Sequence, residues 1–570
     1  QGRRMLWDNS NIIESYHGPT LPLTYSFASR SYTIVYQLFC EVMGVSASVI
    51  RQNAGVFPRM IGLVRGRIYY NLDAWYRVVS LLPGYRWNRD FLESMMGVSE
   101  VAPASIDEED GPGRWGDLLR LIRMMTGLGW RVFRIDRDVA GFTAEFEDAM
   151  AAHCRDLSGH GPHELLDIYG DLERRLLWAW STPIVNDFMV MIFHGLLGKL
   201  CDKWAPDEPD LHNALLAGEG GLSSAAPALE ALRLARDIRD RVEWRVLFVS
   251  PLSDKEVYAA SEEVPSLRSV LDSYLDSWGD RCVNELKLET PSLRDQPERL
   301  IATLRAYLQS SEASNEVSGG HERAMRLDAE ARAFRVITGW KKLVFGWVLG
   351  KARDRVRDRE NLRFLRTRIF GRVRDIFRAL GSRMVRAGSL AVATDVFWLT
   401  TDEVFGWVRG TTVTVDPRSL ADLRRSEYAE WSRQPVPADR FGTWGPVWAD
   451  NLFVGKPVGT PSGDLTGLSA FPGEVEGVVR RVFDPDAAGD IDGAIMIAYR
   501  TDPGWVPLFP RIAALVVERG SLLSHSAVVA RELGVPTVVA VAGVMDALND
   551  GDWVRVDASA GLIEVLVRAE

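Results

Sequence analysis

The chain has 570 residues, 46% of them hydrophobic and 25% charged, which is the composition of a globular protein with a large core and room for two to four domains. Its net charge of −10 and the lack of a basic, aromatic surface pattern argue against a nucleic-acid partner. We find no apolar run of ~18 residues and no signal peptide, so we expect a cytoplasmic protein with no membrane partner.

The cysteines are scattered, with no CxxC pair and no histidine at metal-ligand spacing. We therefore expect reduced thiols and no metal site. The four residues are Cys40, Cys154, Cys201 and Cys282. The first residue is Gln1 rather than Met, which suggests a processed or excised piece of a longer protein.

The first 30 residues are polar and rich in turn formers. Gly18-Pro19 and Pro22 interrupt them, which predicts an ordered surface loop followed by a helix from about Ser29. Hydrogen bonds from Asn and Thr side chains would be enough to hold such a loop.

From about residue 30 to residue 430 the sequence predicts a mainly helical region, because apolar residues recur at spacings of three and four. Two segments read as strands instead, Arg67–Tyr70 and Trp244–Val249. The small, polar segment Ser310–Gly320 is predicted to be a mobile loop. The predicted helices cover residues 31–46, 116–129, 143–155, 164–180, 184–203, 225–243, 264–284, 297–310, 322–350 and 351–388.

Large aromatic side chains are frequent in this helical region and allow two interpretations. They could line an apolar substrate pocket, but aromatic residues dominate ordinary cores, which is the more common case. The tryptophans concerned are Trp178, Trp180, Trp340, Trp347, Trp398 and Trp407.

Three histidines of the helical region are interpreted as structural. His160 and His163 flank a Gly-Pro pair, which is typical of a loop that caps the next helix. His194 lies among apolar residues, and we predict a hydrogen-bonded core histidine there rather than a base.

Between Lys351 and Arg386 this acidic chain carries an unusual concentration of arginines. Arg359, Arg363 and Arg366 fall on one face of the predicted helix. Neighbouring acidic residues would make this a solvated, salt-bridged face. A forked guanidinium is also well suited to a phosphoryl group, so the same face is a candidate phosphoryl-binding surface.

The sequence after this helix changes character twice. Ala393–Glu403 is predicted to be a short buried piece with a helix N-cap at Thr400 or Thr401 and a structural role. Residues 432–468 hold many prolines and glycines, which predicts a flexible linker. Strands are then expected at residues 474–483, 494–499, 513–517, 537–540 and 553–556, and their mixture with short helices predicts an α/β module.

His525 lies in a strand–turn–helix segment near the end of the chain. Ile512–Val517 is an apolar, β-branched run typical of a buried strand. Residues 526–533 follow a helical pattern that Gly534 and Pro536 would end. His525 thus falls at the start of a helix, where free N–H groups and the helix dipole favour an anion. A phosphorylated histidine is such an anion, and a merely helix-capping histidine is the alternative.

The residues around His525 resemble a known family, the phosphohistidine domain of the phosphoenolpyruvate synthase, pyruvate phosphate dikinase and rifampin phosphotransferase group. Phe471–Gly477 and Thr501–Pro507 also resemble this group. Ser521 replaces the second glycine of the usual pair, and Leu-Ser-His-Ser replaces the Thr-Cys-His-Ala of the dikinases, so the form is closer to the rifampin phosphotransferase branch. The matching residues are Gly520, Leu523-Ser524-His525-Ser526-Ala527, Val529-Ala530-Arg531, Gly534 and Pro536.

Two further segments resemble the acceptor-binding parts of the same group. The Asn, Glu and Pro-x-x-Pro-Leu-Thr pattern of the first 30 residues is similar to its acceptor-binding loop, with candidate residues Asn11, Glu14 and His17. Arg359-Glu-x-x-Arg363-x-x-Arg366 resembles its Arg-Glu…Arg pattern. These three arginines are therefore candidates for binding the phosphoryl group on the acceptor side.

The resemblance implies an ATP-dependent phosphotransferase component of three parts. A mainly α-helical acceptor domain would cover residues 1–431, a flexible linker residues 432–468, and a swivelling α/β phosphohistidine domain residues 469–570. The group's ATP-grasp domain and phosphoenolpyruvate-binding barrel have no counterpart in this chain. This arrangement resembles rifampin phosphotransferase without its ATP-grasp domain, and the His-bearing subunit of phenylphosphate synthase.

By the same resemblance, ATP and Mg²⁺ would bind a separate ATP-grasp subunit or domain. The β-phosphoryl of ATP would pass to His525, leaving AMP and phosphate, and then to a hydroxyl of a small organic acceptor. Ser524, Ser526 and Arg531 would support the phosphoryl group, although Arg531 could instead pair with Glu532 or Glu518.

Two alternative functions remain open at this point. The chain could be a phosphocarrier or regulatory subunit with no acceptor site, or a phosphoenolpyruvate synthase-like enzyme that uses pyruvate, against which the missing barrel argues. The base that deprotonates an acceptor hydroxyl also stays open among His17, His160, His163 and Glu14.

Overall fold

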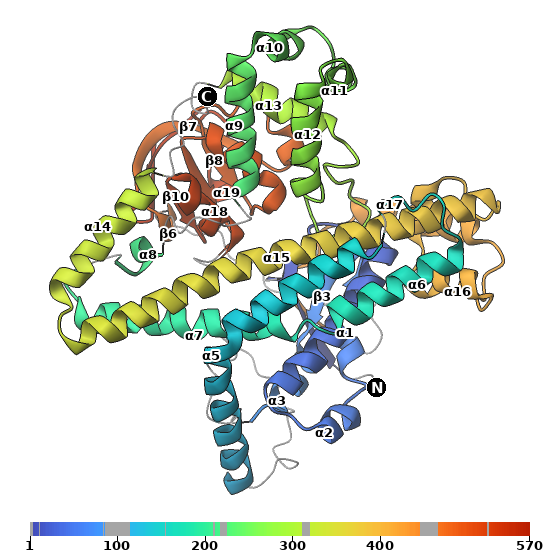
Figure 1. Ribbon diagram of the computed structural model, residues 1–570, viewed down its shortest axis with the longest axis horizontal. Coiled ribbons are helices and arrows are strands. Elements are labelled where there is room, and N and C mark those ends of the chain that lie inside the picture. Colours follow the sequence, from blue (N-terminus) through green and yellow to red (C-terminus); the bar gives the residue numbers. More distant parts are fainter. Residues whose placement is uncertain are drawn as a thin grey trace. The chain divides into compact units, whose positions relative to one another are not determined.

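The computed structural model describes the chain apart from residues 1–3, 11, 84, 86–113, 154, 209–210, 217–224, 311–319, 445–464, 521–523 and 570. It divides into two compact units, whose helices and strands are drawn in Figure 1. Unit 1 comprises residues 1–189, 286–289 and 369–457, and unit 2 comprises residues 190–285, 290–368 and 458–570. The long helices α7 (Ser181–Trp204) and α15 (Trp340–Arg386) each contribute residues to both units.

Unit 1 contains a four-stranded antiparallel sheet in the order β2-β3-β1-β4. The ring of Trp7 lies over Gly62, where an added Cβ would be 2.3 Å from it, and the indole Nε1 donates a hydrogen bond to Thr443 Oγ1 at 3.0 Å. The strands are β1 (Arg4–Asp8), β2 (Ile61–Val64), β3 (Arg67–Asn71) and β4 (Arg440–Trp444). The predicted strand at Arg67–Tyr70 is therefore confirmed.

The prediction of a flexible linker over residues 432–468 is wrong for part of that range. Residues 440–444 form β4, which pairs with β1 in the register Leu6↔Gly442. β5 (Leu465–Thr466) and the start of β6 (Leu468–Phe471) belong to the sheet of unit 2. Local composition cannot reveal such pairing, because the partner strands lie far away in the sequence. Residues 445–464 lie outside the described residues.

The helices of unit 1 surround an aromatic core. The rings of Phe27 and Phe370 lie 5.0 Å apart, and the ring of Tyr169 lies 5.0 Å from Phe405 and 5.9 Å from Phe377. Apart from the parts of α7 and α15, the helices are α1 (Pro22–Val42), α2 (Ala47–Gln52), α3 (Leu72–Ser80), α5 (Arg114–Ala151), α6 (Pro162–Leu172), α16 (Thr401–Arg409) and α17 (Pro417–Arg433), with a π-helical turn η4 (Glu173–Leu177) after α6.

Two helix starts in unit 1 bear on the predictions. α1 begins at Pro22, earlier than the predicted Ser29, because proline is favoured at the first helical position, where its missing N–H costs nothing. α16 begins after Thr400, whose Oγ1 accepts the Glu403 N–H at 3.2 Å while the Glu403 carboxylate accepts the Thr400 N–H at 2.7 Å. The predicted N-cap is thus confirmed at Thr400.

Unit 2 combines a helical part with an eight-stranded sheet. The helical part contains α8 (Leu211–Leu215), α9 (Ala226–Asp240), α10 (Val242–Val249), α11 (Asp254–Ala260), α12 (Pro265–Trp278), α13 (Glu298–Gln309) and α14 (Gly320–Val336). The predicted strand Trp244–Val249 is wrong, because this segment forms α10. Trp244 and Phe248, one helical turn apart, are both buried in the core of α9–α13.

The sheet of unit 2 has the order β5-β12-β11-β7-β8-β9-β10-β6, with β7 to β10 parallel. Side chains of β8 and β9 alternate between two buried cores, so both faces of the sheet are covered. One core includes helix α18 (His525–Leu533), the 3-10 segment η9 (Pro503–Arg511) and the start of α9, and the other includes α19 (Val544–Ala547). The remaining strands are β7 (Glu474–Val482), β8 (Ile495–Ala498), β9 (Ala514–Val517), β10 (Thr537–Val539), β11 (Trp553–Asp557) and β12 (Leu562–Val567).

The predicted strand-rich C-terminal module is confirmed, but the predicted helical domain over residues 1–431 differs from the division into units. Ala225 and Ala228 belong to the same buried cluster as Leu515 and Ala527 of the C-terminal module. This shared core places residues 190–285 and 290–368 with the module rather than with residues 1–189. Helical periodicity predicts where helices lie but not which core they join.

The structure also bears on the predictions made for the cysteines, for a membrane-spanning run and for the loop Ser310–Gly320. Cys40 and Cys201 are buried and free, Cys282 is buried, and Cys154 lies outside the described residues. By length and composition alone, one helical stretch, Pro162–Trp204, could cross a membrane, with a window of mean hydropathy 1.4 that is 39% buried; the core helices of many proteins meet the same test. The expectation that no run is long enough is therefore wrong. The predicted loop Ser310–Gly320 falls mostly on residues outside the described part.

Candidate functional site

Helix α18 begins at His525, as the sequence predicts. Ser524 is its N-cap, and the Ser524 Oγ accepts the Ala527 N–H at 3.4 Å. The helix ends at Gly534, whose φ of 69° is in the left-handed region. The His525 side chain lies outside what the structure describes, so its position follows from the backbone alone: it occupies the first helical position, where N–H groups are free.

The neighbours of His525 on α18 are buried. Ser524 and Ser526 are 6% and 2% exposed, and Ser524 uses its oxygen for the cap. Arg531 is 5% exposed and donates from Nε to the carbonyl oxygen of Ala470 at 2.9 Å. Burial lowers the pKa of Arg531 to about 10.

Of the two acidic residues considered as partners of Arg531, Glu532 affects its pKa and Glu518 makes a hydrogen bond elsewhere. The charge of Glu532 raises the pKa of Arg531, opposing the effect of burial. Glu518 instead accepts the Met545 N–H at 3.0 Å. Arg531 therefore places a buried positive charge on the helix that His525 begins.

Two histidines from the helical part of unit 2 lie near this buried arginine. His194 of α7 and His212 of α8 have ring centroids 4.2 Å apart. Burial first, and then the charges of His212, Arg531 and Arg359, lower the pKa of His194 from 6.5 to about 3. We call His194, His212, Arg359 and Arg531 the cationic cluster, in which the two arginines carry the positive charge. Its members are far apart in the sequence, and His212 was missed because nothing local distinguishes it.

The candidate arginine face lies on the part of α15 that belongs to unit 2. Arg363 donates from Nη1 to Glu360 Oε1 at 3.4 Å, and Glu360 is 3% exposed. Arg366 is half-buried, and its shielded Nε has no hydrogen-bond partner among the residues that the structure describes. The face is therefore partly shielded rather than a fully solvated salt-bridged surface.

Other arginines of α15 have structural contacts. In unit 2, Arg355 is 1% exposed and pairs with Asp358 at 2.9 Å. In unit 1, Arg374 donates to the carbonyl oxygens of Leu288 and Lys287 at 3.1 and 3.0 Å. The prediction of a solvated, salt-bridged helix is therefore wrong for these two residues, because their charged groups are buried next to acceptor oxygens.

A segment of the C-terminal module packs against the helical part of unit 2. We call residues 501–507 the docking loop and residues 280–285 the connector. The Asp502 carboxylate accepts the N–H groups of Asn284 at 3.0 Å and Gly504 at 2.8 Å. A Cβ on Gly504 would lie 2.5 Å from the Cα of Val283, so only glycine allows this approach. Burial raises the pKa of Asp502.

The connector is also joined to α15. Glu285 accepts a hydrogen bond from Thr367 Oγ1 at 2.6 Å and pairs with Arg281 Nη1 at 2.7 Å. Thr367 lies one turn after Arg363 and next to Arg366 in the sequence. The docking loop, the connector and the arginine face are therefore linked by direct contacts within unit 2.

A cavity of about 260 Å³ lies between the docking loop and helices α12 and α13. Two further contacts flank it: Tyr307 Oη donates to the Pro507 carbonyl at 2.8 Å, and Arg299 pairs with Asp486 at 2.9 Å. Its lining includes Tyr274, Trp278, Cys282, Thr303, Gly504 and Arg511. Both the helical part and the C-terminal module thus contribute to one cavity.

The predicted acceptor loop belongs to unit 1. Asn11 lies outside the described residues, the Glu14 side chain is not described, and His17 is exposed. Thr24, after the loop, donates to Glu289 Oε2 at 2.5 Å and accepts the Leu288 N–H at 2.8 Å. These bonds are the threonine hydrogen bonds expected of an ordered capping loop.

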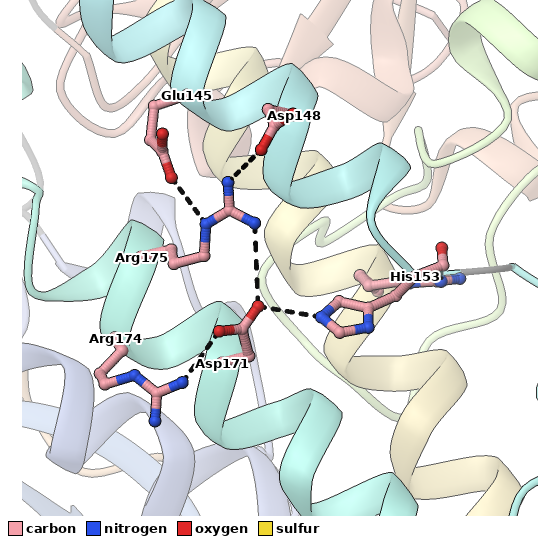
Figure 2. Close-up of polar contacts among 7 residues, drawn as sticks. Glu145, Asp148, His153, Asp171, Arg174 and Arg175 are labelled. Atoms are coloured by element: carbon pink, nitrogen blue, oxygen red, sulfur yellow. Dashed lines mark hydrogen bonds and ion pairs between the residues drawn. The ribbon is translucent and has the colours of Figure 1, made fainter.

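A second polar network in unit 1 joins α5 to α6 and η4 (Figure 2). Arg175 donates to Glu145 at 2.6 Å and also contacts Asp148. Asp171 accepts hydrogen bonds from His153 Nε2 at 3.0 Å and from Arg174 at 2.9 Å. The bond from His153 is the main cause that holds the pKa of Asp171 below its usual value. Each side chain labelled in Figure 2 makes at least one of these contacts, so we interpret the network as a structural connection between the helices.

None of the six tryptophans considered for an apolar substrate pocket lines the cavity of about 260 Å³. Trp178, Trp340 and Trp347 are 45%, 67% and 48% exposed, so the core interpretation is wrong for them. Trp398 packs against Tyr428 with ring centroids 5.3 Å apart, as expected of a core residue. Among the described residues, no group of three His, Cys, Asp or Glu side chains is arranged to hold a metal ion.

Comparisons with known families match two segments of the chain. Residues 490–561 match the PEP-utilising enzyme, mobile domain, and residues 183–360 match the rifampicin phosphotransferase fourth domain. The first segment contains the docking loop and α18, and the second contains His194, His212 and Arg359. The cationic cluster is thus drawn from both matched segments.

Curated relatives extend beyond the length of this chain. A rifampicin phosphotransferase of Streptomyces sviceus is 28% identical over 377 residues, covering 64% of this chain and 42% of the relative. One of Bacillus subtilis is 28% identical over 313 residues, covering 52% of this chain and 34% of the relative. An uncharacterised protein of Mycobacterium tuberculosis is 26% identical over 570 residues, covering 98% of this chain and 61% of the relative. The resemblance to the phosphoenolpyruvate synthase, pyruvate phosphate dikinase and rifampin phosphotransferase group is thereby confirmed by a mobile domain and a rifampicin phosphotransferase fourth domain in one chain.

Proposed function

We propose that this chain is the phosphotransfer component of an ATP-dependent phosphotransferase. An ATP-grasp subunit or domain phosphorylates His525 with the β-phosphoryl of ATP, and this chain passes the group to a hydroxyl of a small organic acceptor. The observation that carries the proposal is the mobile-domain match around His525 at the start of α18, together with the cationic cluster. The mobile domain contributes Arg531 to this cluster, and the matched fourth domain contributes its other three members.

The residues of this chain have distinct parts in the proposed transfer. Neutral imidazole is a nucleophile near neutral pH, and its phosphorylated form is a reactive donor. The free N–H groups at the start of α18 stabilise the phosphoryl oxygens, with Ser526 close by. Arg359, Arg363 and Arg366 receive the negative charge on the acceptor side.

ATP and Mg²⁺ belong to the ATP-grasp partner in this proposal. When bound there, Mg²⁺ neutralises charge on the phosphates of ATP. The acceptor is a hydroxyl compound. Rifampicin appears in the names of several relatives and is the first compound to test. The acceptor loop of unit 1, with Asn11, Glu14 and His17, is proposed to contact it.

The cavity and the contacts within unit 2 favour an acceptor enzyme over a bare phosphocarrier. A carrier needs only a docking surface, whereas the C-terminal module and the helical part together line a partly open cavity of about 260 Å³. The docking loop, the connector and the arginine face are also linked, which fixes the module against the face that would receive the phosphoryl group. We expect the module to leave this arrangement to reach the ATP-grasp partner, because one histidine must serve two sites.

An acceptor screen tests this function. The chain is incubated with ATP, Mg²⁺ and an ATP-grasp protein of the same organism, and AMP formation is measured with rifampicin and a panel of hydroxyl compounds. AMP formation that depends on one compound, together with a phosphorylated product, is the expected result. A stoichiometric burst of AMP with no acceptor dependence for any compound would instead support the phosphocarrier, and a phosphorylated product from pyruvate alone would support the phosphoenolpyruvate synthase-like alternative.

A further inference from the structure

His194 and His212 have polar atoms that the fold leaves without partners. The Nε2 atoms of both rings are shielded from solvent and have no hydrogen-bond partner among the residues that the structure describes. A buried polar atom without a partner costs free energy, typically about 1–3 kcal/mol. The prediction of a hydrogen-bonded core histidine at position 194 is therefore wrong, and the cost points to a function for the pair.

The packing around the pair holds the two rings in place. His212 lies over Gly198, one turn after His194 on α7, and a Cβ at Gly198 would be 3.6 Å from the His212 ring. The rings meet edge to face, with an interplanar angle of 67°. A side chain larger than alanine at position 198 would displace His212. Gly198 thus allows the pair to form.

The charges near the pair come from three helices. Arg531 lies on α18, the helix that His525 begins, and Arg359 lies on the candidate arginine face of α15. Both lower the pKa of His194, whereas Arg531 but not Arg359 is among the groups that lower the pKa of His212. Asp202 of α7 raises the pKa of His212. His194 is therefore the ring whose pKa both arginines lower, one arginine from each side of the proposed transfer.

We propose that His194 is the base that accepts the proton of the acceptor hydroxyl, and that His212 is a positioning residue for the His194 ring. The proposal rests on the proposed function, because it requires a phosphoryl group on His525. It assigns the general base to a histidine pair of unit 2 and not to the candidates in unit 1.

The proposed step balances in atoms and charge. The acceptor oxygen forms a bond to phosphorus as the P–N bond to His525 breaks, and the electron pair of that bond stays on the His525 imidazole. The hydroxyl proton moves to Nε2 of His194, which becomes an imidazolium. His525 leaves as a neutral imidazole when its other ring nitrogen carries a proton, and His194 later returns its proton to water.

Arrival of the phosphoryl group makes His194 a better base. Without it, burial and the arginine charges keep the ring neutral, which is the form that accepts a proton. A phosphoryl dianion between Arg359 and Arg531 offsets their charges and favours the imidazolium. Proton acceptance is thus coupled to delivery of the group that needs it.

The decay of the phosphorylated chain tests this role without knowledge of the acceptor, because water is itself a hydroxyl acceptor. The chain is phosphorylated with ATP and an ATP-grasp protein, freed of nucleotide, and followed by intact-mass measurement in acceptor-free buffer. We expect His194→Gln and His194→Asn to slow decay roughly 100-fold, the scale of a lost general base. His212→Asn should slow it less, and Lys199→Gln, at an exposed position of α7, should decay like the parent.

The pH profile separates a base from a structural residue. The ratio of parent to His194→Gln decay rates should fall toward one as the pH drops through the pKa of His194, because the protonated ring cannot act as a base. A parent profile with no such ionisation, or His194 variants that decay at the parent rate, would overturn the proposal. A chain that is never phosphorylated would instead contradict the proposed function, and this shows before the decay phase begins.

Discussion

At the scale of single residues, His194 makes the stability of unit 2 depend on pH. Its folded pKa of about 3 lies below the ordinary value of 6.5. The unfolded chain therefore binds a proton that the folded chain does not, so this contribution is complete above pH 6.5 and is lost as the pH falls toward 3. Between about pH 7 and about pH 5 we expect a loss of about 2 kcal/mol from this residue.

Urea unfolding of the parent and of His194→Gln at the two pH values measures this effect. The variant lacks the titrating ring, so its free energy of unfolding should change by about 2 kcal/mol less than that of the parent. Equal changes in both proteins would show that the pKa of His194 is the same in the folded and the unfolded chain.

The arginine face can also be tested through a single residue, Arg366. We expect Arg366→Ala to slow transfer from phosphorylated His525 to the acceptor by about 30- to 1000-fold, because a charge-assisted contact in the transition state is worth ~2–4 kcal/mol. Single-turnover transfer, started from the phosphorylated chain, measures the rate. Phosphorylation of His525 should not change, because it takes place on the ATP-grasp partner.

Arg357→Ala is the matched control for this substitution. It removes an arginine of the same helix that pairs with Asp354 at 2.8 Å, at a position where both side chains are 36% exposed. Surface pairs of this kind contribute little to stability. If both variants transfer at the parent rate, the arginine face has no part in the reaction.

At the scale of elements, the docking loop holds the C-terminal module against the connector. Gly504→Val should prevent this contact, because even a Cβ would lie 2.5 Å from the Cα of Val283 and 2.6 Å from its nitrogen, which are backbone atoms that cannot yield. We expect phosphorylation of His525 to persist and transfer to the acceptor to fall at least ~10-fold. Persistence of phosphorylation shows that the module itself has folded.

Transfer at the parent rate in Gly504→Val would contradict the docking role. Asp502→Ala offers an independent test of the same contact, since it removes the carboxylate that accepts the Asn284 and Gly504 N–H groups. Both substitutions disrupt contacts of the docking loop with neighbouring connector residues, Asn284 and Val283, and should have the same effect on transfer.

Elements were predictable from the sequence where the signal is local. The helix at 525–533 follows from Ser524, its apolar spacing and Gly534, and the cap at Thr400 follows from Glu403 three residues later. β4 was missed because its partner β1 lies at the other end of the chain. α10 was predicted as a strand because an apolar run this short fits either structure.

The candidate site, too, could be predicted only where its residues are close together in the sequence. Motif resemblance points to His525 and the arginine face, each of which is contiguous in sequence. The cationic cluster joins residues 194, 212, 359 and 531, and only the packing of α7, α8, α15 and α18 brings them together. His194 was judged from its apolar neighbours, which do not reveal that its Nε2 lacks a partner.

At the scale of the whole molecule, the account requires the C-terminal module to move. A short thiol cross-link between Arg299→Cys and Asp486→Cys, which replace a pair now 2.9 Å apart, would hold the module on the helical part. The cross-linked chain should resist phosphorylation by the ATP-grasp protein, while a chain phosphorylated first and then cross-linked should still transfer. Each single-cysteine variant treated with the same reagent is the control.

Phosphorylation of the cross-linked chain at the parent rate would show that the ATP site lies beside the docked module. Domain movements of the proposed kind take microseconds to milliseconds, so the untreated chain should not be limited by them at ordinary turnover rates. Release of the cross-link with a reducing agent, where the reagent permits, should restore phosphorylation.

The most direct measurement is the mass of the chain after incubation with ATP, Mg²⁺ and the ATP-grasp protein. The account predicts one phosphoryl group per chain, labile in acid and stable in base, on a peptide that contains His525, and none on His525→Ala. The same mass shift in His525→Ala, or a phosphate that survives acid, would contradict the assignment of His525 as the phosphorylated residue.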